Sequence, residues 1–328
     1  MASLKQLATM PERLTGGHRL CSGCGESIIV RQILMGTNHP VVVANATGCL
    51  EVCTTMFPQT AWKVPWIHCA FENVAATISG VEAAYLALKA KGKFDRDVRF
   101  LAFGGDGGTY DIGFQALSGA LERGHRMVYV CLNNEAYMNT GIQRSSATPK
   151  GTFTTTSPVG SARPGKREQR KDLTACVAAH NIPYVAQAIP GRWNDLVTKA
   201  QKAFDAEGPA FLNVLSPCPL GWRHDSSLSA QITRVAVDAC IWPLYEVVDG
   251  EWRLNYAPRQ KLPVEDYFRL QGRYQHLFAK GNEALLKEIQ ETVDKEWDKL
   301  LKKCGGQVWR ERPAPKTAEA TAQAAGAD

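Results

Sequence analysis

No run of apolar residues in this 328-residue sequence approaches the roughly 20 that a helix needs to cross a bilayer. Residues 1–14 lack the continuous apolar core of a secretory signal peptide, so we expect a soluble, cytoplasmic protein. No aromatic-interleaved basic surface and no known nucleic-acid-binding motif is present, and a net charge of +6 is small for this length. The sequence therefore predicts neither a membrane partner nor a nucleic-acid partner.

A disulfide framework is also not expected, because the ten cysteines occur in a chain with no export signal. Several of them fit a role in packing. Cys131 lies inside a predicted strand, and Cys69 and Cys176 lie in apolar surroundings. Four others require a different explanation: Cys21, Cys24, Cys49 and Cys218.

The residues between 98 and 134 predict a strand, a glycine-rich turn, a helix and a second strand. An apolar run at 98–103 ends in the turn that contains Asp106, and a helical apolar pattern follows over 112–123. A second apolar run at 127–132 leads to Asn134. Because the connections are short, we expect a right-handed crossover between parallel neighbouring strands. Asp106 and Asn134 then lie just past the carboxyl ends of the strands, where open α/β sheets bind ligands.

The same alternation continues along the chain and predicts an α/β fold with a doubly wound, mostly parallel sheet. Further strands are expected at 41–44, 182–186 and 210–215, and further helices at 72–91, 172–179 and 194–206. We divide the chain into an N-terminal arm (1–17), an α/β domain (18–220), an irregular C-terminal extension (221–308) with a hairpin near Asp249 and a helix at 283–304, and a disordered tail (309–328).

The residue types at the predicted sheet edge indicate which ligand binds there. The carboxylate of Asp106 and the amide oxygen of Asn134 suit Mg²⁺, which takes its remaining ligands from phosphate and water. Glycines on both sides of Asp106 let backbone N–H groups approach phosphate oxygens. Gly-Asp-Gly followed at this spacing by Asn-Asn resembles the thiamine-diphosphate signature. By that resemblance, Asp106, Asn134 and the main-chain carbonyl of Ala136 hold the metal.

Cys21 and Cys24 form a Cys-x-x-Cys pair at the start of a predicted helix, and three interpretations of the pair are open. A thioredoxin-like dithiol would follow a strand, and residues 16–20 predict a poor strand. A structural zinc site would need a second such pair, which the sequence lacks. An iron–sulfur cluster would need two more cysteines. Cys49 and Cys218 both follow predicted strands, and Cys53 is a competitor for the place of Cys49.

An ordered series of motifs resembles the thiamine-binding beta subunit of the pyruvate:ferredoxin oxidoreductase family, over most of residues 18–280. The series includes CSGCGE, NATGCLEV, GGDGGTYDIGFQALSGALERGH, NNEAYMNTGIQ, VLSPCPLGW and RLQGRYQHL. The resemblance implies that one 4Fe-4S cluster is bound by Cys21, Cys24, Cys49 and Cys218. It also implies that Asn139 faces the substrate and that a larger set binds thiamine diphosphate: Glu26, Thr47, Gly48, Cys49, Leu50, Gly105, Gly107, Gly108, Met138, Asn139 and Thr140.

The resemblance further implies a reaction and partners. A 2-oxoacid, most commonly pyruvate, is decarboxylated oxidatively on thiamine diphosphate to acyl-coenzyme A and CO₂, and single electrons pass through the cluster to ferredoxin or flavodoxin. In this family the activating glutamate and the aminopyrimidine pocket come from another domain, so an alpha subunit is expected to supply them. Because the sequence has no CxxCxxCxxxCP run, ferredoxin-like clusters are expected on subunits of the gamma or delta type.

Three alternatives are weighed against this interpretation. A member of the same family could act on 2-oxoisovalerate, oxalate or an arylglyoxylate. A non-redox thiamine-dependent lyase would have no need of the four cysteines. A non-catalytic protein could use the same four cysteines to bind zinc, and metal analysis would distinguish it by zinc in place of iron and sulfide.

Residues 143–171 show no periodicity and are too many for a plain connector in a compact domain, so we expect a functional loop. Its basic run at 163–171 predicts a solvated surface or, alternatively, a docking surface for an acidic partner.

Overall fold

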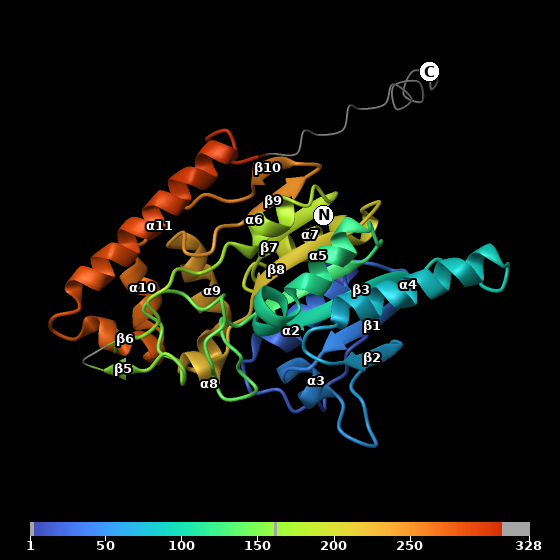
Figure 1. The fold of residues 1–328 in the computed structure, drawn as a ribbon, viewed down its shortest axis with the longest axis horizontal. Helices are drawn as coiled ribbons and strands as arrows, with labels where there is room; N and C mark the ends of the chain where they lie inside the picture. The colour runs from blue at the N-terminus through green and yellow to red at the C-terminus, as the bar shows by residue number, and fades with distance from the viewer. Residues whose placement is uncertain (1–2, 161–162, 310–328) are drawn as a thin grey trace, which may run out of the picture.

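A mostly parallel, eight-stranded sheet forms the centre of the molecule (Figure 1). The computed structural model describes residues 3–160 and 163–309. The strand order is β10-β9-β7-β8-β4-β3-β1-β2, and the strands from β7 to β2 run parallel. Their bounds are β1 (Val41–Ala46), β2 (Trp66–Cys69), β3 (Arg99–Gly105), β4 (Val128–Asn133), β7 (Tyr184–Ala188) and β8 (Ala210–Leu215). The predicted α/β class and the parallel pairing of the two strands around the glycine-rich turn are confirmed.

The central strands are buried on both faces, which explains why they read as continuous apolar runs in the sequence. In β3, Leu101 and Phe103 belong to one core, and Phe100 and Ala102 belong to the core on the other face. β4 alternates in the same way, with Val130 in the same core as Leu101. Each face of the sheet therefore needs its own layer of helices.

Helices cover both faces and produce the three layers of a doubly wound fold (Figure 1). The core that contains Phe100 is closed by α4 (Val74–Ala90), α5 (Phe114–Glu122) and α6 (Leu173–Ala178). The core that contains Leu101 is closed by α2 (Gly25–Leu34) and α7 (Trp193–Asp205). Shorter helices lie in the loops: α1 (Leu4–Leu7), α3 (Cys49–Thr54) and α8 (Pro219–Trp222).

The helix predicted over 112–123 begins differently from expectation. A π-helical turn, η1 (Gly107–Ile112), follows Asp106 directly, and α5 starts at Phe114. The turn closes where the N–H of Gly113 donates to the Gly108 carbonyl at 2.7 Å. Apolar periodicity could not reveal this turn, because its first two residues are glycines. Single π-helical turns occur frequently at functional sites.

The order in which strands join the sheet reverses at β1. β2 pairs with one side of β1 and β3 with the other, and β4 then continues outward from β3. The loops that leave the carboxyl ends of β1 and β3 therefore diverge. In open α/β sheets, this divergence creates the crevice in which ligands bind.

The residues after 220 form regular structure, so the prediction of an irregular extension is wrong. β9 (Tyr245–Val248) and β10 (Glu251–Leu254) make the hairpin expected near Asp249, and β9 pairs with β7, so the sheet crosses the boundary placed at residue 220. The pairing of β9 with β7 was not expected, because it joins segments about 60 residues apart that no local pattern connects. The helical segments share a core of their own: η2 (Ser226–Leu228), α9 (Ser229–Asp238), α10 (Val264–Arg269), η3 (Gly272–Phe278) and α11 (Glu283–Lys303).

The N-terminal arm is anchored to the domain, because Leu14 is fully buried and forms a β-bridge with Trp62. At the other end, the N–H of Trp309 donates to the Leu254 carbonyl at 2.8 Å. The rest of the tail predicted to be disordered, residues 310–328, lies outside the described residues. Within the described ranges, every helix is too short or too polar to span a membrane.

We expect Leu212→Ala to lower the free energy of unfolding by about 2–5 kcal/mol, because Leu212 is fully buried in β8 between two parallel strands. Urea denaturation followed by circular dichroism measures the change. Leu86→Ala, on the exposed side of α4, is the matched control and should stay within about 0.5 kcal/mol of the parent chain. Equal losses in the two variants would contradict this description of the core.

Candidate functional site

A cleft opens at the carboxyl ends of β1, β3 and β4, in the crevice that the strand order creates. The loops after these three strands and the start of α2 contribute its lining. All the residues that the sequence motifs suggested for thiamine diphosphate or Mg²⁺ line this one cleft: Glu26, Thr47, Gly48, Cys49, Leu50, Gly105, Asp106, Gly107, Gly108, Asn134, Ala136, Met138, Asn139 and Thr140.

Asp106 is fully buried at the end of β3. Its Oδ1 accepts a hydrogen bond from the backbone N–H of Asn134 at 3.2 Å, and its Oδ2 accepts one from the Ser145 hydroxyl. Burial raises the pKa of the Asp106 carboxyl to about 8, although the hydrogen bond from Ser145 opposes the shift. A nearby cation would offset the desolvation of the carboxylate, so this environment fits a metal ligand.

Asn134 and Glu26 present buried oxygen atoms that have no hydrogen-bond partner among the described residues. Asn134 Nδ2 donates to Glu26 Oε1 at 3.2 Å, and Asn134 Oδ1 and Glu26 Oε2 are left unsatisfied. Burial also raises the pKa of Glu26 to about 7. Because buried polar atoms in native proteins are nearly always satisfied, this set of oxygen donors fits a hard cation such as Mg²⁺.

Glu135 lies between Asn134 and Ala136 and adopts a left-handed backbone conformation with φ of 68°. Such a conformation costs a non-glycine residue about 1–3 kcal/mol and persists where the surroundings enforce it. The carboxylate of Glu135 is fully buried and accepts hydrogen bonds from Arg273 at 2.5 Å and from Arg170 at 3.4 Å. These two arginines hold the turn that orients Asn134 and Ala136 toward the cleft.

Three of the five basic side chains in the 163–171 run point inward, contrary to the predicted solvated surface. Lys166 is buried, and its Nζ donates to two backbone carbonyls of the neighbouring loop. Arg170 contacts Glu135, and Lys171 donates to the backbone carbonyl of Tyr110 in η1. The run therefore supports the loops of the cleft, because backbone carbonyls and a buried carboxylate accept its hydrogen bonds.

Two glycines of the turn after Asp106 are needed for close packing. A Cβ atom at Gly107 would lie 2.3 Å from the ring of Tyr137, whose hydroxyl donates to the Gly107 carbonyl at 3.0 Å. A Cβ atom at Gly108 would lie 2.8 Å from the carbonyl oxygen of Phe71. Side chains at these positions would therefore separate the loops that close the cleft.

The chain segments that carry the four cysteines meet beside the cleft. Cys24 precedes α2, Cys49 begins α3, and Cys218 precedes α8. The backbone N–H of Gly25 donates to the Pro217 carbonyl at 2.9 Å, which joins the Cys-x-x-Cys turn to the turn of Cys218. A Cβ atom at Gly25 would lie 2.3 Å from the ring of Pro217, so glycine permits this close contact.

The thiols also influence one another electrostatically. Burial raises the pKa values of Cys24 and Cys49, and the Glu26 carboxyl and the neighbouring thiols, Cys218 among them, add to the shifts. The pKa of Cys218 is raised mainly by burial, with a contribution from Cys21. Buried thiols that resist ionisation become thiolates when they bind a metal. The four cysteines thus fit a shared cluster.

A single metal ion fits this arrangement less well. In the described part of the chain, no three His, Cys, Asp or Glu side chains surround one point as they would around one ion. The ligands of a 4Fe-4S cluster bind different iron atoms and need not converge in this way. Cys53, the competitor for the place of Cys49, lies half-buried in α3 and interacts with Cys21. Cys176, expected in apolar surroundings, is exposed on α6.

The rim of the cleft connects the turn that carries Asn134 and Ala136 to the cysteines. Asn139 and Thr140 are exposed there. The Asn139 side chain lies close to the Cys49 thiol and counteracts the rise in the pKa of Cys49 that burial and Glu26 cause. Met138 is half-buried against α8, where a Cβ atom at Gly221 would lie 2.3 Å from the Met138 sulfur.

Several residues of the site were not identified from the sequence. Ser145 contacts Asp106 and Arg273 contacts Glu135, across 39 and 138 residues of chain. Arg273 belongs to the motif RLQGRYQHL, but no spacing rule connects residues so far apart. Other residues of the cleft lining were also missed: Asn45, Ala46, Phe71, Leu132 and Tyr137.

Known proteins resemble this chain over most of its length. Residues 46–214 match the family described as thiamine pyrophosphate enzyme, C-terminal TPP binding domain. The chain is 52% identical over 282 residues to pyruvate synthase subunit PorB of Methanocaldococcus jannaschii. This alignment covers 85% of this chain and 95% of the relative. It is 38% identical over 304 residues to ketoisovalerate oxidoreductase subunit VorB of Pyrococcus furiosus, with coverage of 92% and 96%.

One solved structure supports the fold. The 2-oxoglutarate:ferredoxin oxidoreductase from Magnetococcus marinus, with 2-oxoglutarate, coenzyme A and succinyl-CoA bound, superposes with a TM-score of 0.53 at 20% identity. The superposition covers 68% of this chain and 79% of that chain. At this identity the similarity concerns the fold alone.

We expect Arg273→Gln to lower the free energy of unfolding by about 3–5 kcal/mol, because it deprives a buried carboxylate of its shorter ion pair. Adding Glu135→Gln should restore part of the loss by removing the uncompensated charge. Urea unfolding of the single and double variants measures both effects. As a control, Arg269→Gln disrupts a surface ion pair with Glu265 and should cost less than about 1 kcal/mol. We name the contacts of Arg273 and Arg170 with Glu135 the Glu135 clamp. A double variant as unstable as Arg273→Gln would refute its role.

Proposed function

This chain belongs to the thiamine pyrophosphate enzymes and, among them, to the family of pyruvate synthase PorB subunits, and we propose that it is the catalytic beta subunit of a complex that oxidatively decarboxylates pyruvate to acetyl-coenzyme A and CO₂. It is thus a subunit of a 2-oxoacid:ferredoxin oxidoreductase. One observation carries the proposal: Asp106 and Asn134 share a cleft with Cys49, whose thiol interacts with other cysteines of the proposed cluster set.

In this proposal Mg²⁺ is held by the Asp106 carboxylate, Asn134 Oδ1 and the main-chain carbonyl of Ala136, and its other ligands are phosphate oxygens and water. The raised pKa of Asp106 and the unpartnered oxygen of Asn134 support this assignment. Bound thiamine diphosphate would supply the electron sink that decarboxylation of a 2-oxoacid needs. Residues 47–50 border the proposed diphosphate site from the β1 side of the cleft.

Cys21, Cys24, Cys49 and Cys218 are proposed to hold a 4Fe-4S cluster, which supplies a one-electron acceptor close to the cofactor. The electrostatic interactions among the thiols and the contact between the Cys-x-x-Cys and Cys218 turns support this ligand set. Asn139 is proposed to face the substrate, because it lies on the cleft rim and its side chain also contacts Cys49.

Partner subunits are proposed to complete the site. Asn139 and Thr140 are exposed at the rim, and the exposed apolar side chains of Phe57 and Leu220 lie on the segments that carry Cys53 and Cys218. Exposed apolar side chains next to a site fit a surface that another protein covers. An alpha subunit would contribute the activating glutamate and the aminopyrimidine pocket. Subunits of the gamma or delta type would carry ferredoxin-like clusters that pass electrons to ferredoxin or flavodoxin.

Pyruvate is the substrate that sequence similarity favours. The identity to the pyruvate synthase subunit is 52%, against 38% for the ketoisovalerate oxidoreductase subunit. Both relatives match along most of this chain, so the similarity to the ketoisovalerate oxidoreductase subunit makes 2-oxoisovalerate the competing substrate. Coenzyme A is proposed as the acyl acceptor.

We expect Cys218→Ala to remove about four iron atoms and the matching acid-labile sulfide per chain from the anaerobically purified complex, and to abolish ferredoxin reduction. Iron and sulfide analysis of that complex measures the loss. Cys176→Ala, which changes an exposed cysteine on α6, is the control and should retain both. Cys53→Ala should also retain its iron and sulfide. If Cys53→Ala lost them while Cys49→Ala kept them, Cys53 would replace Cys49 as the cluster ligand. Stoichiometric zinc in the parent complex would refute the cluster.

We expect the complex to use pyruvate with a kcat/KM at least about tenfold above that for 2-oxoisovalerate. The larger substrate carries two additional methyl groups, and a change of one methylene in a fitted pocket alters transition-state binding by about 1–3 kcal/mol. Initial rates with a panel of 2-oxoacids, with and without coenzyme A and ferredoxin, measure this preference. Faster turnover of 2-oxoisovalerate would reassign the substrate. Undiminished turnover without ferredoxin would instead identify a non-redox lyase.

A further inference from the structure

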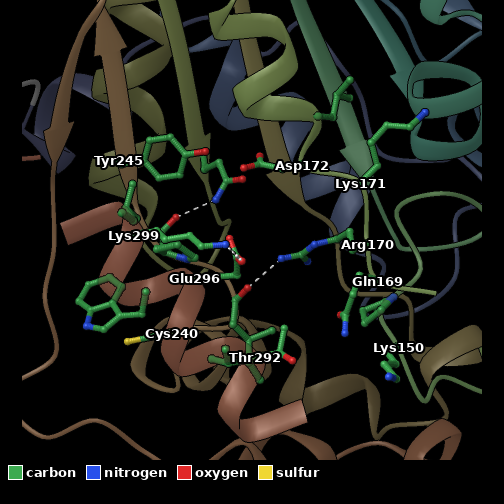
Figure 2. A pocket seen from close by; sticks show the side chains of 18 of the residues that line it. Lys150, Gln169, Arg170, Lys171, Asp172, Cys240, Tyr245, Thr292, Glu296 and Lys299 are labelled. Carbon is green, nitrogen blue, oxygen red and sulfur yellow. Dashed lines mark hydrogen bonds and ion pairs between the residues drawn. The ribbon is translucent and has the colours of Figure 1, made fainter. Parts of the chain in front are cut away.

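A cavity of about 430 Å³ lies between α11, the β9–β10 hairpin and residues 169–173 of the basic loop (Figure 2). α11 contributes eight of its lining residues, and we name it the α11 cavity. None of the residues that line it also lines the cleft at the ends of β1, β3 and β4. Its volume falls within the range of about 300–1,000 Å³ that is typical of small-molecule sites.

The cavity exists because α11 packs firmly at two separated points. Ile289 and Leu300 are the buried residues of α11, and a rise of 1.5 Å per residue places them about 16 Å apart. Between them, Val293 and Trp297 are half-buried and line the cavity without filling it. The wall of the cavity opposite α11 is also apolar and includes the buried side chains of Leu173, Tyr245 and Phe268. An apolar body of a ligand would therefore contact apolar side chains both on α11 and on the opposite wall of the cavity.

Charged side chains in the cavity lining are predominantly basic. The basic residues are Lys150, Arg170, Lys171, Lys299 and Lys303, and the acidic ones are Asp172 and Glu296. Figure 2 shows Arg170 and Lys299 directed toward the cavity from opposite sides, with Glu296 between them. The excess of positive charge favours an anionic group on the ligand.

The basic residues differ in whether an acidic side chain of the protein pairs with them. Lys150 pairs with Glu288, and Lys299 pairs with Glu296 at 2.7 Å on the exposed surface, where such pairs are weak. Lys303 lies 4.2 Å above the centre of the Trp252 ring and has no acidic partner within the described residues. An aromatic wall and an ammonium group without a carboxylate thus stand next to each other at one end of the cavity.

We propose that the α11 cavity binds an amphipathic anion, an aliphatic or aromatic body that carries one carboxylate. The apolar body lies against α11 and the hairpin, and the carboxylate meets Lys303 and Lys299. Arg170 lines the same cavity and holds Glu135 in the metal-binding turn, so the bound anion lies next to the clamp of the cleft. This assignment does not depend on which 2-oxoacid the complex uses.

The test uses 1-anilinonaphthalene-8-sulfonate, an apolar anion, with the purified complex of this chain and its partner subunits. Trp252 and Trp297 line the cavity, so binding is followed by energy transfer from tryptophan to the probe. We expect saturable binding to one site per chain. Lys303→Glu should weaken it at least about tenfold, because it replaces a charge-assisted contact by repulsion. Val293→Trp, which fills the cavity from α11, should abolish it.

Lys302→Glu is the matched control: it makes the same change of charge on the adjacent exposed residue of α11, which does not line the cavity. It should leave the affinity unchanged. If the complex with Val293→Trp fails to assemble, the affinities of Lys303→Glu and Lys302→Glu for the probe decide the test. Decanoate should displace the probe at least about tenfold more effectively than decanol, which lacks the charge. Absence of saturable binding, equal affinities in the two lysine variants or equal displacement by the two competitors would each overturn the proposal.

Discussion

The buried ion pair between Glu135 and Arg273 is the contact on which the rest of the site depends. Glu135 has a left-handed backbone, and the residues on either side of it, Asn134 and Ala136, are the proposed metal ligands. A strained backbone at this position persists because the Glu135 carboxylate is fully buried and accepts hydrogen bonds from Arg273 and Arg170. The orientation of the turn that carries Asn134 and Ala136 is therefore set by contacts in the interior of the protein.

This ion pair joins the segment after residue 220 to the loops of the cleft. Arg273 comes from η3, and Trp222 of α8 donates its indole N–H to the Asn134 carbonyl at 2.8 Å. α8 also begins next to Cys218, so one short helix contacts both the metal-binding turn and a proposed cluster ligand. A displacement of the extension would thus disturb the oxygen ligands and the cysteines together. The proposed one-electron chemistry requires that coupling, since electron transfer depends on a fixed separation.

The two ends of the molecule provide different surfaces for partners and ligands. The cleft is open at a rim that carries Asn139 and exposed apolar residues, which suits a partner subunit that completes the thiamine site. The α11 cavity is lined by α11, by residues 169–173 and by the β9–β10 hairpin, which extends the sheet beyond β7. Arg170 connects the two regions, because its side chain lines the cavity and contacts Glu135, which lies between the proposed metal ligands Asn134 and Ala136.

The sequence by itself determined the α/β class, the parallel pairing around the glycine-rich turn, and the meeting of Asp106 with Asn134, because a short strand–helix–strand connection permits one arrangement. Tertiary structure alone decided the clamp on Glu135, the inward direction of Lys166 and the addition of the hairpin to the sheet. Glu135 and Arg273 are separated by 138 residues, and no local period or propensity encodes a contact over that distance. Local patterns specify elements and their edges, whereas the partners of buried charges follow from how distant elements pack.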